Sequence, residues 1–197
     1  MRLDEIRIPP GGALPKIDAE ADTFTYVHTG VIEQRSAGNS NLQRAGDFQS
    51  IANGERRKEK NASRTHWARI FRLRIASNSP QAGEGDEVWL QERFTAARRH
   101  NGLCTVASPN GVSGSLALRS DALIYSSVLD FGHHLVHALQ PRRCAWLHMI
   151  CGRATVGEYD LAEGDGIGVS ESAAVSLTAR EDSEILLVDL DAATLAV

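Results

Sequence analysis

Short segments in which apolar and polar residues alternate recur along the whole chain. Within residues 68–75, every second side chain from Phe71 onwards is apolar, and Arg72 and Arg74 fall between them. Side chains two residues apart lie on one face of a strand, so this pattern predicts a strand with one buried face and one polar face. The other segments with strand character are 24–28, 31–35, 102–107, 115–119, 123–129, 144–151, 174–178 and 184–190.

Turn residues separate these segments. Gly38-Asn39, Gly46-Asp47 and Gly164-Asp165 are typical turn signals. Many short strands with frequent turns indicate a β-sandwich or a β-barrel. Only residues 94–99 read as a short helix, and residues 78–86, rich in Ser, Pro and Gly, read as a linker. The sequence therefore predicts an all-β fold.

The composition is that of a folded globular protein. The chain has 197 residues, of which 42% are hydrophobic and 23% are charged. This length forms one large domain or two small ones and can bury a core. The formal net charge of -4 argues against a uniformly basic nucleic-acid binder, so no nucleic-acid partner is expected.

The sequence also bears on the compartment. No apolar run is long enough to cross a membrane, and the N-terminus lacks the apolar core of a signal peptide. Cys104, Cys144 and Cys151 are odd in number and show no C-x-x-C spacing, so a disulfide framework is not expected. Such cysteines fit a reducing environment. We therefore expect a cytoplasmic protein without a membrane partner.

One arrangement of turns occurs twice. In the first half, Gly30 follows a strand, a second strand follows, and Gly46-Asp47 precedes a third. In the second half, Gly152 and Gly164-Asp165 take the same places. Glycine permits a positive-φ turn, and aspartate bonds to the backbone of its own turn. The repeat predicts two similar barrels in tandem, at residues 1–78 and 87–197.

A set of motifs carries a resemblance to a known family. The motifs are Thr25-Tyr26-Val27 with Gly30, Ser36-x-Gly38-Asn39, Ala45-Gly46-Asp47-Phe48-Gln49, Glu59-x-Asn61, Gln91-Glu92-Arg93-Phe94, Gly114-Ser115-Leu116 and Ser183-Glu184-x-Leu186-Leu187-x-Asp189-Leu190. In order and spacing they resemble the pirin family, two-barrel cupins that include bacterial quercetin 2,3-dioxygenases. The resemblance implies two tandem cupin barrels of the double-stranded β-helix, or jelly-roll, type. Full-length members begin further upstream, so the first barrel is expected to be incomplete.

The resemblance also implies a metal position in the first barrel. Typical members hold one metal there through a His-x-His pair and a His-x-Glu pair. In this sequence the four positions are occupied by Lys16, Asp18, Arg57 and Glu59. Lysine and arginine carry no acceptor and stay protonated, so they do not ligate a metal at neutral pH. Only Glu59 keeps the family's ligand type, which predicts a degenerate metal site without a metal cofactor.

The four substituted positions have balanced charge. Lys16 and Arg57 are cations, while Asp18 and Glu59 are anions. One hypothesis is that they form an ion-pair cluster in the space of the lost metal and line a vestigial binding pocket, because a cation there offsets an otherwise unpaired carboxylate. The alternative is that the shortened barrel has opened and these are solvated charges of little energetic weight. The sequence leaves both open.

Other features carry weaker signals. His133-His134-x-x-His137 resembles a metal motif, but no third convergent ligand is evident, and the apolar neighbours indicate a half-buried strand end. Residues 55–74 are strongly basic and residues 158–191 strongly acidic. This polarity either steers a partner or is a solvated strand face.

These observations lead us to expect a binding or regulatory protein without catalytic residues. Its partner is an unknown small molecule or protein, because a barrel cavity outlives the loss of its metal. A module acting through its outer surface stays open as a second reading. A quercetin 2,3-dioxygenase is the enzymatic alternative, although oxygen chemistry in that family needs the metal. Exposed strand edges of an incomplete barrel favour self-association into a homo-oligomer.

Overall fold

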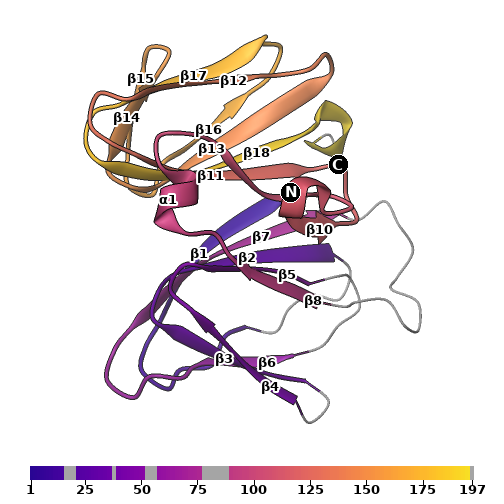
Figure 1. The fold of residues 1–197 in the computed structure, drawn as a ribbon, viewed down its shortest axis with the longest axis vertical. Helices are drawn as coiled ribbons and strands as arrows, with labels where there is room; N and C mark the ends of the chain where they lie inside the picture. The colour runs from indigo at the N-terminus through magenta and orange to yellow at the C-terminus, as the bar shows by residue number, and fades with distance from the viewer. Residues whose placement is uncertain (16–20, 37–38, 52–56, 77–88, 196–197) are drawn as a thin grey trace. The chain divides into compact units, whose positions relative to one another are not determined.

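The computed structural model divides the chain into two compact units, both built mainly from β-strands (Figure 1). The first unit comprises Met1–Phe94 and Asn110–Ser120, and the second comprises Thr95–Pro109 and Asp121–Val197. The boundary expected at residues 78–87 lies outside the described residues. The residues that the structure describes are 1–15, 21–36, 39–51, 57–76 and 89–195.

The first unit contains a five-stranded and a three-stranded sheet, in the orders β1-β7-β2-β5-β8 and β4-β3-β6. All the pairings within these sheets are antiparallel. β10 (Leu116–Leu118) belongs to the same unit and packs against β5 and β8. The strands are β1 (Arg2–Ile8), β2 (Ala21–Thr29), β3 (Val31–Ser36), β4 (Asn39–Arg44), β5 (Asp47–Ile51), β6 (Lys58–Asn61), β7 (Ala68–Ala76) and β8 (Trp89–Arg93).

The three central strands of the five-stranded sheet, β7, β2 and β5, are buried on both faces. On one face, Val27 and Ile70 pack against Ile32 of the three-stranded sheet in an apolar cluster. On the other face, the Tyr26 and Phe48 rings stack at 4.3 Å between centroids. The strand predicted at residues 68–75, with Arg72 and Arg74 on its polar face, is confirmed as β7, but that face is more buried than expected. Arg72 on that face is only 4% exposed, because the three-stranded sheet covers it and supplies its partner.

The second unit also pairs two antiparallel sheets. One contains the run β9-β11-β18-β13-β16, and the other has the order β12-β17-β14-β15. The helix predicted at residues 94–99 begins late, because the Thr95 side chain caps its N-terminus. The elements are α1 (Ala96–Arg99), β9 (Cys104–Pro109), β11 (Leu123–Leu129), β12 (His134–Ala138), β13 (Arg143–Cys151), β14 (Arg153–Val156), β15 (Tyr159–Ala162), β16 (Gly166–Val169), β17 (Ala174–Ala179), β18 (Ser183–Asp191) and η2 (Ala192–Leu195), with η1 (Val112–Gly114) in the first unit.

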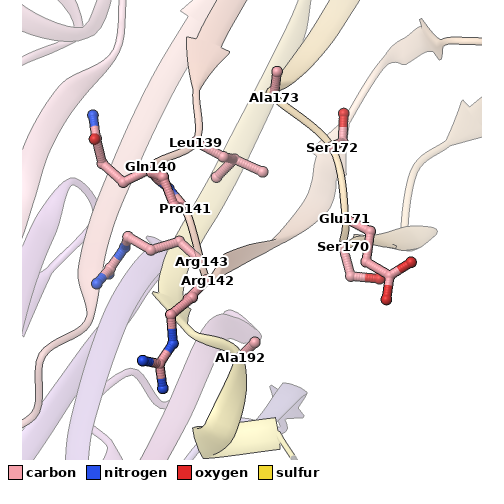
Figure 2. Close-up of a pocket in the computed structure, with 10 residues that line it drawn as sticks. All are labelled: Leu139, Gln140, Pro141, Arg142, Arg143, Ser170, Glu171, Ser172, Ala173 and Ala192. Carbon is pink, nitrogen blue, oxygen red and sulfur yellow. The ribbon is translucent and has the colours of Figure 1, made fainter.

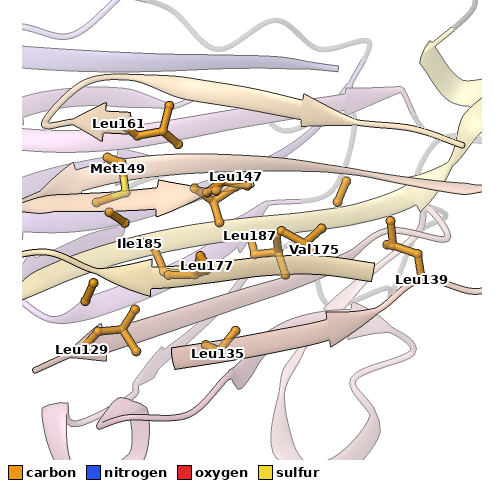
Figure 3. Packing of buried hydrophobic residues seen from close by; sticks show 14 residues of the cluster. Leu129, Leu135, Leu139, Leu147, Met149, Leu161, Val175, Leu177, Ile185 and Leu187 are labelled. Atoms are coloured by element: carbon orange, nitrogen blue, oxygen red, sulfur yellow. The ribbon is translucent and has the colours of Figure 1, made fainter. Parts of the chain in front are cut away.

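The core of the second unit is apolar and continuous (Figure 3). Leu187 of β18 and Leu147 of β13 come from one sheet, and Leu177 and Val175 of β17 come from the other. All four are at most 1% exposed. This burial follows from the two-residue alternation of the strands, which sends every second side chain inward.

The repeated turns are confirmed as structurally equivalent. Gly30 and Gly152 have φ of 88° and 79°, and a Cβ at Gly152 would lie 2.4 Å from the Asp182 carbonyl oxygen. Asp47 Oδ2 accepts from the Arg44 amide at 2.8 Å. Asp165 Oδ2 accepts from the Ala162 amide at 2.9 Å. The same turn chemistry therefore shapes corresponding corners of both units.

Within the described residues, no helix has the length and apolar character needed to span a membrane.

Candidate functional site

Arg57 and Glu59 point into the first unit. They are 7% and 5% exposed, while Lys58 between them is exposed. The spacing of two residues on an extended strand explains why both share the inward face. This places the second pair of predicted positions inside the barrel rather than on an open, solvated edge. Lys16 and Asp18, the first pair, lie outside the described residues, so the four-residue cluster stays a prediction.

The carboxylate of Glu59 is held by an arginine from the opposite sheet. Its Oε2 accepts from Nη2 of Arg72 on β7 at 2.5 Å. The two side chains are 2% and 4% exposed. Nε of Arg72 also donates to Thr25 Oγ1 on β2 at 3.4 Å. A buried carboxylate needs such a partner, because an uncompensated charge in the interior costs several kcal/mol.

Two glutamines continue this contact across the barrel. Nε2 of Gln34 donates to Glu59 Oε1 at 2.6 Å. Gln34 and Gln49 pair reciprocally, with Nε2-to-Oε1 distances of 2.7 Å in both directions. Gln34 and Glu59 are opposite each other on β3 and β6, whereas Gln49 lies on β5 of the other sheet. We call Thr25, Gln34, Gln49, Glu59 and Arg72 the polar layer, which joins the two sheets of the first unit.

Charge fixes the orientation of the central amide. Gln34 Oε1 faces Nη1 of Arg57 at 3.4 Å, and its Nε2 faces the Glu59 carboxylate. Turning this amide over would place its NH2 group against a guanidinium and its oxygen against a carboxylate. Arg57 and Glu59 therefore both favour the same orientation of the Gln34 amide.

The amide of Gln43, next to the polar layer, does not have partners for all of its hydrogen-bonding groups. Gln34 Nε2 has three oxygens within reach, including Gln43 Oε1 at 3.1 Å, but an amide carries only two hydrogens. Nε2 of Gln43 is buried and has no acceptor among the described residues. Gln43 therefore leaves one buried donor unsatisfied in this interior.

A tryptophan marks where the site approaches the surface. The guanidinium carbon of Arg57 lies 5.2 Å from the centroid of the Trp89 ring. Trp89 is 42% exposed, whereas Arg57 is buried. The indole thus covers the guanidinium from the outside, an arrangement typical of a cation–π contact.

The described residues do not fit the metal that the resemblance implies. Arg57 has no lone pair to offer, and both oxygens of Glu59 already accept hydrogen bonds from Arg72 and Gln34. In the described part of the chain, no group of three or more His, Cys, Asp or Glu side chains is placed to hold a metal ion. The site that the geometry defines here is a salt-bridged polar layer.

The histidines of residues 133–137 do not converge. His134 is exposed and its Nδ1 lies 2.9 Å from Thr178 Oγ1. His137 turns inward, and its Nε2 lies 2.8 Å from Asp189 Oδ2 on the opposite sheet of the second unit. His137 therefore has a carboxylate partner that the sequence does not identify.

Asp189 is the centre of this second cluster. It also accepts from Nε of Arg143 on β13. Burial acts to raise the pKa of Asp189, but hydrogen bonds from His137 and Arg143 and the charge of Arg143 outweigh it, so the pKa lies below its usual value. Burial and the Asp189 charge raise the pKa of the nearby Tyr125 hydroxyl. The cluster ties the two sheets of the second unit together.

Sequence reasoning missed the partners within the polar layer. The alternation pattern places Arg72 on a solvated face, and it gives no reason to select Gln34 or Gln49. The one signal in the sequence is the presence of an arginine and two glutamines on strand positions that face inward. Recognising it requires knowing that both faces of β7 are covered, and the alternation of residues does not supply that.

Comparison with known proteins agrees with this architecture. Residues 105–190 match the family model described as the quercetinase C-terminal cupin domain. With its two jelly-roll units, the protein is a two-barrel cupin. Quercetin 2,3-dioxygenase of Escherichia coli K12 is 32% identical over 182 residues, covering 91% of this chain and 75% of that protein. The chain belongs to the pirin family.

Other relatives support the same family and fold. A pirin-like protein of Caulobacter vibrioides is 32% identical over 190 residues, covering 94% of this chain and 80% of that protein. The crystal structure of bacterial pirin YhhW from Escherichia coli in complex with nickel(II) superposes with a TM-score of 0.87 at 26% identity, covering 96% of this chain and 81% of the other. The family and the all-β cupin fold expected from the sequence are thereby confirmed.

Proposed function

We propose that this chain is a pirin-family cupin in which the polar layer replaces the metal site, and that it binds a small molecule or a protein without catalysing oxygen chemistry. The observation that carries the proposal is the engagement of Glu59, which is bonded on one oxygen to Arg72 and on the other to Gln34.

The energetics favour this arrangement over a bound cation. A metal ion at Glu59 would displace the guanidinium of Arg72 or lie beside it, with Arg57 also close by. Two or three cations would then share one described carboxylate in a buried site. Like charges at such distances repel strongly where water is excluded. Lys16 and Asp18 complete the proposed vestigial pocket, as the family resemblance implies.

The enzymatic alternative rests on the relatives. Several similar proteins carry the name quercetin 2,3-dioxygenase, and one similar pirin structure holds nickel(II). Fold alone does not transmit that activity, because chemistry belongs to the residues of the site. The described positions in this chain offer one carboxylate and no imidazole.

Metal content and oxygen uptake test the proposal. Tag-free protein is loaded with iron, copper, nickel or manganese, desalted and measured by mass spectrometry, and oxygen consumption is then followed with quercetin. We expect far less than one metal ion per chain and no uptake above that of the free metal. One tightly held metal per chain with quercetin-dependent uptake would establish the dioxygenase reading instead.

A matched variant makes the negative result informative. The variant carries four substitutions. Lys16→His, Asp18→His and Arg57→His restore the ligand types that the family resemblance implies, and Arg72→Gln releases Glu59 from its ion pair. We expect this variant to bind metal with a stoichiometry approaching one while the native chain does not. Equal metal content in both proteins would mean that these positions do not govern metal binding.

A ligand screen separates the two non-catalytic readings. Thermal-shift measurements with a small-molecule library are made on the native chain and on Trp89→Ala, which uncovers Arg57. Hits that lose their effect in the variant support binding inside the first barrel. Absence of any hit, together with a stable complex with a protein partner, would favour action through the outer surface.

A further inference from the structure

A pocket of about 450 Å³ lies on the second unit, and none of its lining residues belongs to the polar layer. Its walls come from the turn between β12 and β13 and from the loop between β16 and β17 (Figure 2). Leu139, Pro141, Ala173 and Ala192 give it an apolar floor. A volume of this size suits a small organic molecule.

Two charged residues on its walls have an unusual backbone. Arg142 and Glu171 have φ of 68° and 54°, in the left-handed region. Side chains with a Cβ are disfavoured there, and glycine is the residue usually found. The two residues lie far apart in sequence, yet both line this one pocket. Backbone strain that gathers at one place is a feature of functional sites.

The turn around Arg142 shows why the strain is real. The Arg143 amide donates to the Gln140 carbonyl at 3.1 Å, which closes a β-turn with Pro141 at its second position. Proline fixes a negative φ, so a positive φ at the next residue defines a type II turn. That third position favours glycine or asparagine. The chain has an arginine there instead.

Both charges are available. Arg142 and Glu171 are exposed, and neither forms an ion pair with any residue that the structure describes. Figure 2 shows the Arg142 and Glu171 side chains on opposite walls of the pocket, with their charged ends directed away from each other. A cation and an anion are thus presented from opposite walls without neutralising each other.

The walls are already fixed in place. The Leu139 amide donates to the Ala173 carbonyl at 2.8 Å, and the Ala192 amide donates to the Arg142 carbonyl at 2.9 Å. Arg143, next to Arg142, is held by Asp121 and Asp189. A preformed pocket loses little entropy when it binds a ligand.

We propose that this pocket binds a small zwitterion with an apolar body, such as a free apolar amino acid or a short peptide. The anionic group of the ligand pairs with Arg142, its cationic group pairs with Glu171, and its apolar part covers Leu139 and Pro141. Strain at the two charged positions is retained because glycine would remove the recognition groups.

Free leucine and leucyl-leucine are the probes, with N-acetyl-leucine and leucinamide as analogues lacking one charge each. Binding to the full chain is followed by amide NMR shifts of residues 139–143 and 170–173. We expect saturable shifts with a Kd below about 1 mM for at least one zwitterion, and binding at least about tenfold weaker for both analogues. No saturable shift from either zwitterion up to about 10 mM would overturn the proposal.

Variants assign each charge. In Arg142→Gly, leucine and leucinamide should bind equally weakly, because the partner of the carboxylate is gone. In Glu171→Gly, leucine and N-acetyl-leucine should bind with equal affinity, because the partner of the ammonium group is gone. Retention of the native preference in either variant would contradict the assignment of that residue.

The same variants report on the strain. Each glycine substitution should raise Tm by about 2–4 °C, as expected for relief of left-handed strain in a chain of this size. Ser113→Gly, at a φ of 59° outside the pocket, is the control and should raise Tm similarly while leaving binding unchanged. Arg142→Gln should lose binding without the gain in Tm. Loss of binding in Ser113→Gly would show that the effect is not local to the pocket.

Discussion

At the scale of single residues, one carboxylate in each unit organises the polar contacts around it. Glu59 fixes the orientation of Gln34 and binds Arg72 across the first barrel. Asp189 binds His137 and Arg143 across the second. Both lie where two sheets face each other, so each contributes to the junction between sheets as well as to local charge balance.

Glu59→Gln should destabilise the first unit. The substitution leaves the Arg72 guanidinium buried without its counter-charge, and breaking a buried pair in this way costs about 3–5 kcal/mol. The free energy of unfolding from urea titration measures the effect. The control is the double variant Glu59→Leu with Arg72→Leu, which removes both charges and should recover much of the loss. A double variant as unstable as the single one would contradict this account.

Asp189→Asn should lower stability in a pH-dependent manner. The pKa of Asp189 is depressed in the folded protein, so its stabilising contribution is present above the unfolded value of about 3.8 and is lost as pH falls through the folded pKa. The difference in free energy of unfolding between native chain and variant should therefore be largest near pH 6–7 and shrink below about pH 4. The exposed Asp160→Asn serves as control. A difference that is constant with pH would argue against the ion pair.

At the scale of strands and turns, most of the predicted elements rest on the alternation of apolar and polar residues and on the positions of glycines. The segment predicted at residues 123–129 coincides with β11, and the segment at 144–151 extends by one residue to form β13. β1 was not anticipated, because its mixture of charged residues hides its strand character. In the fold those charges pair across strands, as Glu5 does with Arg69 and Asp4 with Arg74. The basic stretch at residues 55–74 is in part neutralised this way.

The repeated glycines permit a prediction on turns. Gly152→Ala should cost about 1 kcal/mol for the positive φ and about 1–3 kcal/mol more for overlap with the Asp182 carbonyl and Ser183. Gly132→Ala carries the same positive φ, but its new methyl group would meet no atom within 4 Å beyond its chain neighbours, so only the first cost applies. Chemical denaturation compares the two. Equal losses would mean that the corner at Gly152 relaxes freely.

At the scale of the whole chain, the division into two compact units is the dominant feature. Ile70 belongs to the apolar cluster of the first unit, and Leu187 belongs to that of the second. Each cluster draws on both sheets of its own unit. We therefore expect the local stability of each unit to depend mainly on its own apolar cluster.

Core truncations test how independent the units are. Ile70→Ala and Leu187→Ala each remove buried apolar volume and should cost about 2–5 kcal/mol. Hydrogen exchange measured by mass spectrometry follows both variants. Ile70→Ala should raise exchange mainly in β2, β5 and β7, and Leu187→Ala mainly in β11, β13 and β18. The two variants control for each other. Uniform acceleration across the chain in both would indicate a single cooperative unit.

The candidate site was only partly predictable. The inward placement of Arg57 and Glu59 follows from their spacing on a strand, and the family resemblance points to both. The sequence alone does not single out Arg72 and Gln34 as the partners of Glu59, although they hold it. Alternation assigns a residue to a face, but the residue that meets it from the opposite sheet depends on the register of several strand pairs and on how the sheets are stacked.

Local patterns were enough to predict the all-β class, the repeated turns and the resemblance to the family. These depend on residue periodicity, turn chemistry and motif order. The folded chain was needed to learn that Glu59 meets Arg72, that Asp189 meets His137, and that Arg142 and Glu171 share one pocket. Each of these contacts joins segments that lie apart in the chain, and their proximity results from sheet packing that no local pattern encodes.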